Sequence, residues 1–172
     1  MIISPGPASP ERTTGIDPRR GKLRVAIGLF GHHLDAGASA QDLEQGGVAQ
    51  ARIAFAARSE LIESPALAAR RAGGYGWLSY SPCDDSAWGS FVLVSQAGEA
   101  ASAEFCLVGD ALNDHLHQRS LRQQERQLHT HLQGDGWLLI VRLTEAAEQH
   151  AVCSTLLRRA RFGVQSHEMR RT

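Results

Sequence analysis

The sequence predicts an α+β domain in which two βαβ units flank a long insertion. The first observation is a strand, a helix and a strand within residues 24–57, each with its own hydrophobic periodicity. The second is the same order of elements within residues 137–168. The intervening residues, about 58–136, form the insertion.

The first unit is defined by two alternating strands. Arg24–Phe30 and Gln50–Ala57 each place apolar side chains at every second position, which is typical of strands buried on at least one side. A helix is expected over Ala36–Gln45. Asp35 can serve as its N-cap, and Gly46-Gly47 supplies a residue for the left-handed position that ends a helix.

The second unit begins with the strongest strand signal in the chain, Trp137–Leu143. Thr144 is a plausible N-cap, and the glutamates that follow suit the positive end of a helix dipole. The helix is expected to run to about Ala160, and Arg161–Glu168 is expected to form the last strand.

The insertion carries weaker signals. Ser59–Arg71 is helix-like although Pro65 interrupts it, and residues 73–89 are rich in turn-forming residues. Phe91–Gln96 and Ala103–Gly109 are predicted as short strands that form a hairpin around the intervening glycine.

Two helices are predicted at the end of the insertion, because the leucines of residues 110–133 cannot share one helical face. Leu112 and Leu116 lie together on a helical wheel, and Leu121, Leu128 and Leu132 lie almost opposite. A break within residues 117–120 divides the segment into two helices, each with one apolar stripe of leucines. Ser120 and Gln123 fit a capping box, so the second helix is expected over residues 121–133.

Together, two βαβ units predict a ferredoxin-like βαββαβ sandwich with its insertion between strands 2 and 3. Residues 1–22 are expected to form a flexible leader, and residues 23–172 a single domain. Arg24–Phe30 and Trp137–Leu143 are apolar on both faces. The face opposite the two helices should therefore be covered, either by the insertion or by a second subunit.

Composition excludes several classes of function. Lys+Arg and Asp+Glu both number 18, so no basic excess is available for nucleic acid or an anionic membrane. No apolar run approaches the roughly 20 residues of a membrane helix. The three cysteines, Cys83, Cys106 and Cys153, are widely spaced, which favours reduced thiols in a cytoplasmic protein.

A candidate ligand site is expected where the end of strand 1 meets the start of strand 3. Its six residues are His32, His33, Asp35, Arg58, His131 and Asp135. Such a cluster could hold a divalent metal or an anion. The alternative is a polar sheet end in which Asp35 only caps a helix.

Other sequence patterns give weaker evidence for a functional site. The pairs His115/His117 and His129/His131 are spaced i, i+2, so a helix directs their side chains to different sides and neither pair chelates one ion. Arg119–Arg126 is interpreted as a solvated helix face. No nucleophile, dinucleotide or phosphate-loop motif is present, so no catalytic residue, metal or cofactor is assigned.

Three aromatic residues, Trp77, Tyr80 and Trp88, lie in the turn-rich part of the insertion. Aromatic side chains on a long loop either plug the core or anchor a partner protein.

Two stretches resemble the bacterial general-stress (heat-induced stress) protein domains of unknown function. They are VAIGLFGHHLDAGASAQDLEQGGVAQARIAFAAR, at residues 25–58, and ERQLHTHLQGDGWLLIVRLTEAAEQHAVCSTLLRRARFGV, at residues 125–164. The resemblance implies the same fold and a non-enzymatic role, and it brings no catalytic residues. In that family the middle is often an apolar Gly/Ala-rich segment, whereas residues 75–109 here are more polar.

The resulting hypothesis is a non-enzymatic cytoplasmic domain that acts by self-association, as a dimer, or by binding a protein partner, with a role in stress adaptation or regulation. The alternative is a small-molecule or metal-binding sensor that uses the strand 1/strand 3 end. An enzyme is the weakest hypothesis, since this fold hosts many functions.

Overall fold

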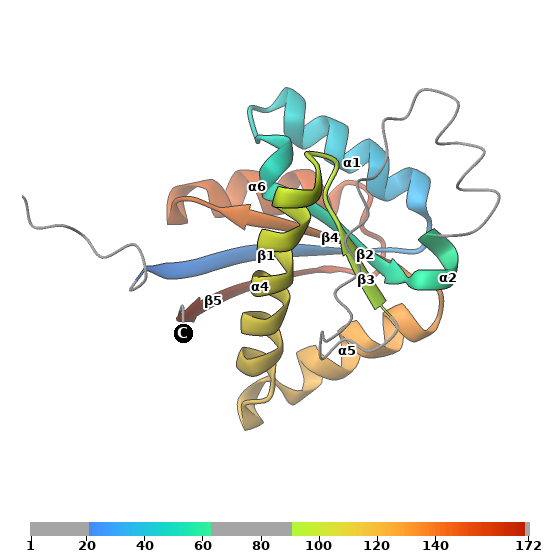
Figure 1. Cartoon of the computed structure of the whole chain (residues 1–172), viewed down its shortest axis with the longest axis vertical. Helices are drawn as coiled ribbons and strands as arrows, with labels where there is room; N and C mark the ends of the chain where they lie inside the picture. Colours follow the sequence, from blue (N-terminus) through green and yellow to red (C-terminus); the bar gives the residue numbers. More distant parts are fainter. Residues whose placement is uncertain (1–20, 63–90, 171–172) are drawn as a thin grey trace, which may run out of the picture.

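The computed structural model describes residues 21–62 and 91–170, and it is built around one antiparallel sheet (Figure 1). The sheet has five strands in the order β3-β2-β4-β1-β5. The strands are β1 (Lys22–Phe30), β2 (Ile53–Arg58), β3 (Phe91–Val94), β4 (Trp137–Leu143) and β5 (Val164–Arg170). The predicted α+β class is therefore confirmed.

Helices cover both faces of this sheet. On one face, α1 and α6 lie side by side, and on the other α4 crosses from β3 to β5 while α5 packs under β2 and β4 (Figure 1). The helices are α1 (His33–Gln45), α2 (Ser59–Ile62), α4 (Glu99–Leu116), α5 (Arg122–Gln133) and α6 (Gln149–Leu157), with short 3-10 turns η2 (Gln50–Arg52), η3 (Arg119–Leu121) and η4 (Ala146–Glu148).

The two central strands, β1 and β4, are buried on both sides. The face of β1 that carries Ala26 and Phe30 packs under α1 and α6, and the face that carries Val25, Ile27 and Leu29 packs under α4 and α5. The predicted insertion supplies α4 and α5. The second apolar face is therefore covered by the same chain, and a second subunit is not needed there.

The predicted strand Ala103–Gly109 is wrong, because these residues lie within α4. Their local sequence favours a strand, but Phe105, Val108 and Leu112 recur at helical spacing and pack together in the core. Burial of that stripe outweighs β-propensity. The expected hairpin is absent from the described residues: β3 pairs with β2 instead, and Gly98, with φ at 117°, begins the helix.

The predicted break between two helices is confirmed. The first helix, α4, ends at Leu116 and α5 begins at Arg122. The capping box is wrong, since Ser120 lies inside η3 and no side-chain hydrogen bond caps α5. The 3-10 turn between the helices takes the place of that cap.

The cap of α1 also differs from the prediction. The N-cap is His32, whose Nδ1 accepts a hydrogen bond from the Leu34 N–H at 3.3 Å. Asp35 instead lies in the first turn, where its negative charge interacts favourably with the positive end of the helix dipole. The glycine expected in the left-handed position is Gly47, with φ at 97°.

Thr144 does not cap α6. Its backbone N–H and hydroxyl both donate to the Glu148 carboxylate, at 3.0 and 2.9 Å. Several predictions lie outside the described residues: the first 20 residues of the flexible leader, Pro65, the turn-rich segment with its aromatic residues, and Cys83. The leader is predicted to reach residue 22, which is wrong at its end, because Lys22 already lies in β1 and pairs with Arg170. Among the helices of the described residues, none is long and apolar enough to cross a membrane.

A polar network lies between β5 and the helices above it. His167 is 6% exposed, and its Nε2–H donates to Gln165 Oε1 at 2.9 Å. Its ring lies nearly perpendicular to that of His115 of α4, with the ring centres 5.5 Å apart. Burial, and to a smaller extent the charge of the neighbouring His115, together lower the pKa of His167 to about 4.

We expect His167 to make the fold acid-sensitive. Between pH 6.5 and about 4 the unfolded chain binds a proton on this ring and the folded chain does not. The contribution of His167 to the free energy of unfolding is therefore fully present above pH 6.5. It falls by up to about 3 kcal/mol as the pH drops towards 4. In urea unfolding at pH 7 and pH 5, His167→Leu should lose less stability between the two than the wild type does. His150→Leu, at an exposed position of α6, is the matched control. Equal losses for His167→Leu and wild type would contradict the assignment.

Candidate functional site

The end of the sheet predicted as a ligand site does bring several elements together. β1 ends at Phe30, which pairs with Trp137 at the start of β4, and β2 ends at Arg58. The turn that leads from α5 into β4 closes the same end. Three strand ends and a helix end therefore meet as expected from antiparallel pairing.

His131 has a structural role at this sheet end. Its Nε2 lies 2.8 Å from the Phe30 carbonyl oxygen and 3.3 Å from that of Trp137. Because both carbonyls only accept, this nitrogen carries a hydrogen and donates. It thus ties α5 to the last pair of β1 and β4, and its ring also contacts Phe162 with centres 5.0 Å apart. A metal cannot use the same nitrogen while these bonds exist.

Asp135 lies in the turn that ends α5. The Asp135 N–H donates to the Leu132 carbonyl at 3.2 Å, and the Gly136 N–H donates to the His131 carbonyl at 2.9 Å. This is the hydrogen-bond pattern of a Schellman motif, with Asp135 at the left-handed position, φ 62°. Gly136 is required as well, because a Cβ there would overlap both the ring and the carbonyl oxygen of His131.

Arg58 and Asp135 form an ion pair, which agrees with the prediction that both lie at this end of the sheet. Arg58 Nη1 lies 3.1 Å from Asp135 Oδ1, and Nη2 lies 2.6 Å from Glu60 Oε2. The three side chains are between 35% and 66% exposed, so each pair contributes at most about 1 kcal/mol.

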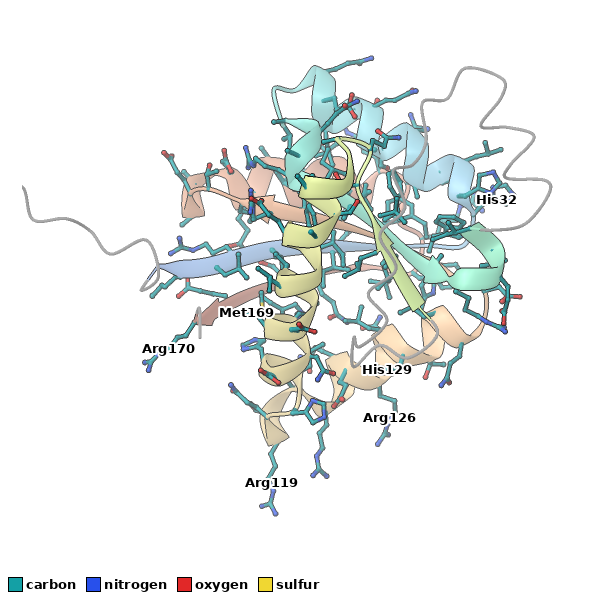
Figure 2. All side chains as sticks on the ribbon, viewed as in Figure 1. His32, Arg119, Arg126, His129, Met169 and Arg170 are labelled. Atoms are coloured by element: carbon teal, nitrogen blue, oxygen red, sulfur yellow. The ribbon has the colours of Figure 1, made fainter. Side chains whose placement is uncertain are left out.

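The two histidines that follow β1 stack on each other. The ring centres of His32 and His33 are 4.6 Å apart, and His33 also contacts Trp137 at 5.8 Å. His32 points away from the body of the protein in Figure 2. Within residues 21–62 and 91–170, no group of three or more His, Cys, Asp or Glu side chains is arranged to hold a metal ion. The predicted residues thus gather, but their side chains bond mainly to one another and to the backbone.

A groove opens beside this sheet end, and sequence reasoning missed it. It has a volume of about 1140 Å³ and is lined by Leu29, Gly31, Arg119, Ser120, Arg122, Gln123, Arg126, Gln127, Thr130, His131, Gly134, Gly136 and Phe162. We call it the arginine groove. Its lining includes Phe162, which is 56% exposed, and residues of α5 and the preceding turn.

Three arginines give the groove its charge. Arg119, Arg122 and Arg126 follow one another at intervals of three and four, which places them on one side of η3 and α5. Among the described residues, none of the three forms an ion pair. Arg119 and Arg126 extend away from the body of the protein in Figure 2. The signal for this groove was the arginine spacing, which on sequence grounds alone is indistinguishable from a solvated face.

Gln127 links the groove to the polar network that contains Gln165 and His167 of β5. Its Nε2 donates to the Phe162 carbonyl at 3.3 Å, and its Oε1 accepts from Gln165 at 2.8 Å. Gln127 therefore connects Phe162, which lines the groove, with Gln165 of β5.

Comparison with protein-family models, with curated proteins and with solved structures gave no match.

We expect His131→Ala to lower the free energy of unfolding by about 1–3 kcal/mol, because two strand-end carbonyls lose their donor. His131→Gln keeps a donor of similar reach and should lose less. Urea denaturation of both variants at pH 8 measures the difference. Equal stability of His131→Ala and wild type would show that the bonds to the carbonyls are dispensable.

The left-handed position of Asp135 predicts a different ranking. Asp135→Gly relieves backbone strain while it removes the exposed ion pair, so it should leave stability nearly unchanged. Asp135→Ala loses the ion pair and keeps the strain, so it should be less stable than Asp135→Gly by about 1 kcal/mol. Thermal unfolding of the two variants side by side gives the ranking. An alanine variant as stable as the glycine variant would refute the backbone argument.

Proposed function

We propose that this chain is a non-enzymatic cytoplasmic domain with a ferredoxin-like arrangement, and that it binds a small anionic molecule in the arginine groove. The observation that carries the proposal is that Arg119, Arg122 and Arg126 all line one groove and have no ion-pair partner among the described residues.

The chemistry of the lining favours a phosphate or carboxylate that is attached to a flat apolar group. A guanidinium offers a rigid fork of donors that matches either anion. The exposed ring of Phe162 offers an apolar surface beside those donors. The neutral balance of charges over the whole chain, 18 basic against 18 acidic side chains, favours a small ligand over a nucleic acid.

The arginine groove lies beside the sheet end at which a sensor site is expected. Of the six residues first considered, His131 lines the groove, and its turn supplies Gly134 and Gly136. Arg58 and Asp135 pair with each other, and His32 caps a helix. Their roles in the fold favour the neighbouring groove as the place for a ligand.

The ferredoxin-like arrangement is supported by the strand order β5-β1-β4-β2 within the sheet and by α1 and α6 on one face. In this interpretation β3, α4 and α5 are additions carried by the insertion. A stress-related or regulatory role rests only on the resemblance of the two flanking stretches to the general-stress domains.

The test is a titration of the full chain with phenyl phosphate, inorganic phosphate and benzyl alcohol, followed by backbone amide NMR. Phenyl phosphate should shift the amides of Gly31, Gly134 and their neighbours, inorganic phosphate should do so more weakly, and the neutral alcohol should not. Binding should weaken as ionic strength rises. If neither anion shifts these amides, the proposal fails.

A matched pair of variants locates the site. Arg126→Glu should weaken phenyl phosphate binding about tenfold or more, because a charge-assisted hydrogen bond is replaced by repulsion. Arg158→Glu makes the same change of charge at an exposed position outside the groove, and it should have little effect. Equal weakening by both would point to a general effect of net charge.

A further inference from the structure

One edge of the sheet is open in the described part of the chain. β5 is the last strand, and its only strand partner is β1. The Leu29 N–H donates to the Gly163 carbonyl at 3.0 Å, so the backbone groups of Leu29, and of every second residue before it, point towards β5. Open edges of this kind are templates for a further strand.

The register then identifies which residues of β5 point outwards. Ile27 pairs with Gln165, Val25 with His167 and Leu23 with Met169, so the backbone groups of these three β5 residues are used by β1. The alternate residues present their N–H and carbonyl groups to the outside. These are Val164, Ser166, Glu168 and Arg170. No described backbone group bonds to them.

The surroundings of this edge leave room for a strand. A hollow of about 380 Å³ lies between the end of α4 and β5, and it is lined by Ala111, Asp114, His115, Gln118, Glu168, Met169 and Arg170. The charge of Glu168 is already balanced within the chain, since its carboxylate lies 2.6 Å from Lys22 and 2.8 Å from Arg24. In Figure 2, Met169 lies beside α4 and Arg170 extends outwards.

We propose that β5 pairs antiparallel with β5 of a second copy of this chain, about a two-fold axis at His167. This register places Ser166 opposite Glu168 and Val164 opposite Arg170, so all four outward residues find a partner and no like charges face each other directly. A register centred on Glu168 would oppose two carboxylates, and one centred on Ser166 would leave Arg170 unpaired. A register centred on Met169 would oppose Glu168 and Arg170 but leave Val164 and Ser166 without partners in the strand, so the register centred on His167 is the one that pairs all four outward residues. This self-complementarity of the edge favours a second copy as the occupant.

This interface is independent of the proposed anion site. The outward residues of β5 do not line the arginine groove, and the groove residues of α5 do not belong to the sheet edge. Anion binding without dimerisation would refute only the interface, and dimerisation without anion binding would refute only the groove. Because pairing along a single strand is a small interface, the dimer should depend on concentration.

The test is sedimentation equilibrium of the full chain up to about 1 mM. The wild type should form a dimer. Ser166→Pro removes one outward N–H without disturbing the bonds to β1, so it should be monomeric with an unchanged circular dichroism spectrum. Ser166→Thr keeps that N–H and should dimerise. A monomeric wild type, or a Ser166→Pro variant that dimerises as well as wild type, overturns the proposal.

A second pair of variants tests the register and avoids proline. Ser166→Glu would face Glu168 of the second copy twice by symmetry, so it should weaken the dimer by about 3- to 30-fold. Ser166→Arg would face the same carboxylates and should dimerise at least as well as the wild type. Equal dissociation constants for these two variants would refute the register centred on His167.

Discussion

The pairing of β1 with β4 is the constraint on which the rest of the structure depends. Seven residues of each strand are in register, from Arg24 with Leu143 to Phe30 with Trp137. Both strands are buried on both faces, so the sheet is stable in water only between two layers of helices. The βαβ units supply one layer, α1 and α6. The insertion supplies the other, α4 and α5, and is therefore part of the fold.

This constraint also decides how the polar residues at the sheet end are used. Where β1 and β4 end, their last carbonyls need donors, and His131 provides one from the end of α5. Asp135 occupies the left-handed position of the turn, and Arg58 pairs with it from β2. Side chains that looked like ligands in the sequence thus stabilise the junction. The groove beside them contains the arginines that the fold itself does not use.

Much of the architecture could be predicted from periodicity. The four strands of the βαβ units lie within a few residues of their predicted bounds. The break between α4 and α5 followed from two leucine stripes that no single helix can bury. Ala103–Gly109 could not be assigned locally, because a short apolar run fits a strand and a buried helix equally well. The core contact of Phe105 and Val108 decided it.

What the sequence by itself determined is the two βαβ units, the break before α5 and the need for a second covering layer, because hydrophobic periodicity and two-sided strands are local properties. It also determined that Arg58, His131 and Asp135 lie near one end of the sheet, since antiparallel connection places them there. Only the tertiary structure decided their roles. Whether a histidine binds a ligand or bonds to a carbonyl depends on contacts between residues that are 101 positions apart, such as His131 and Phe30. Such contacts leave no periodic trace in the chain, and the same holds for the arginine groove and the open edge of β5.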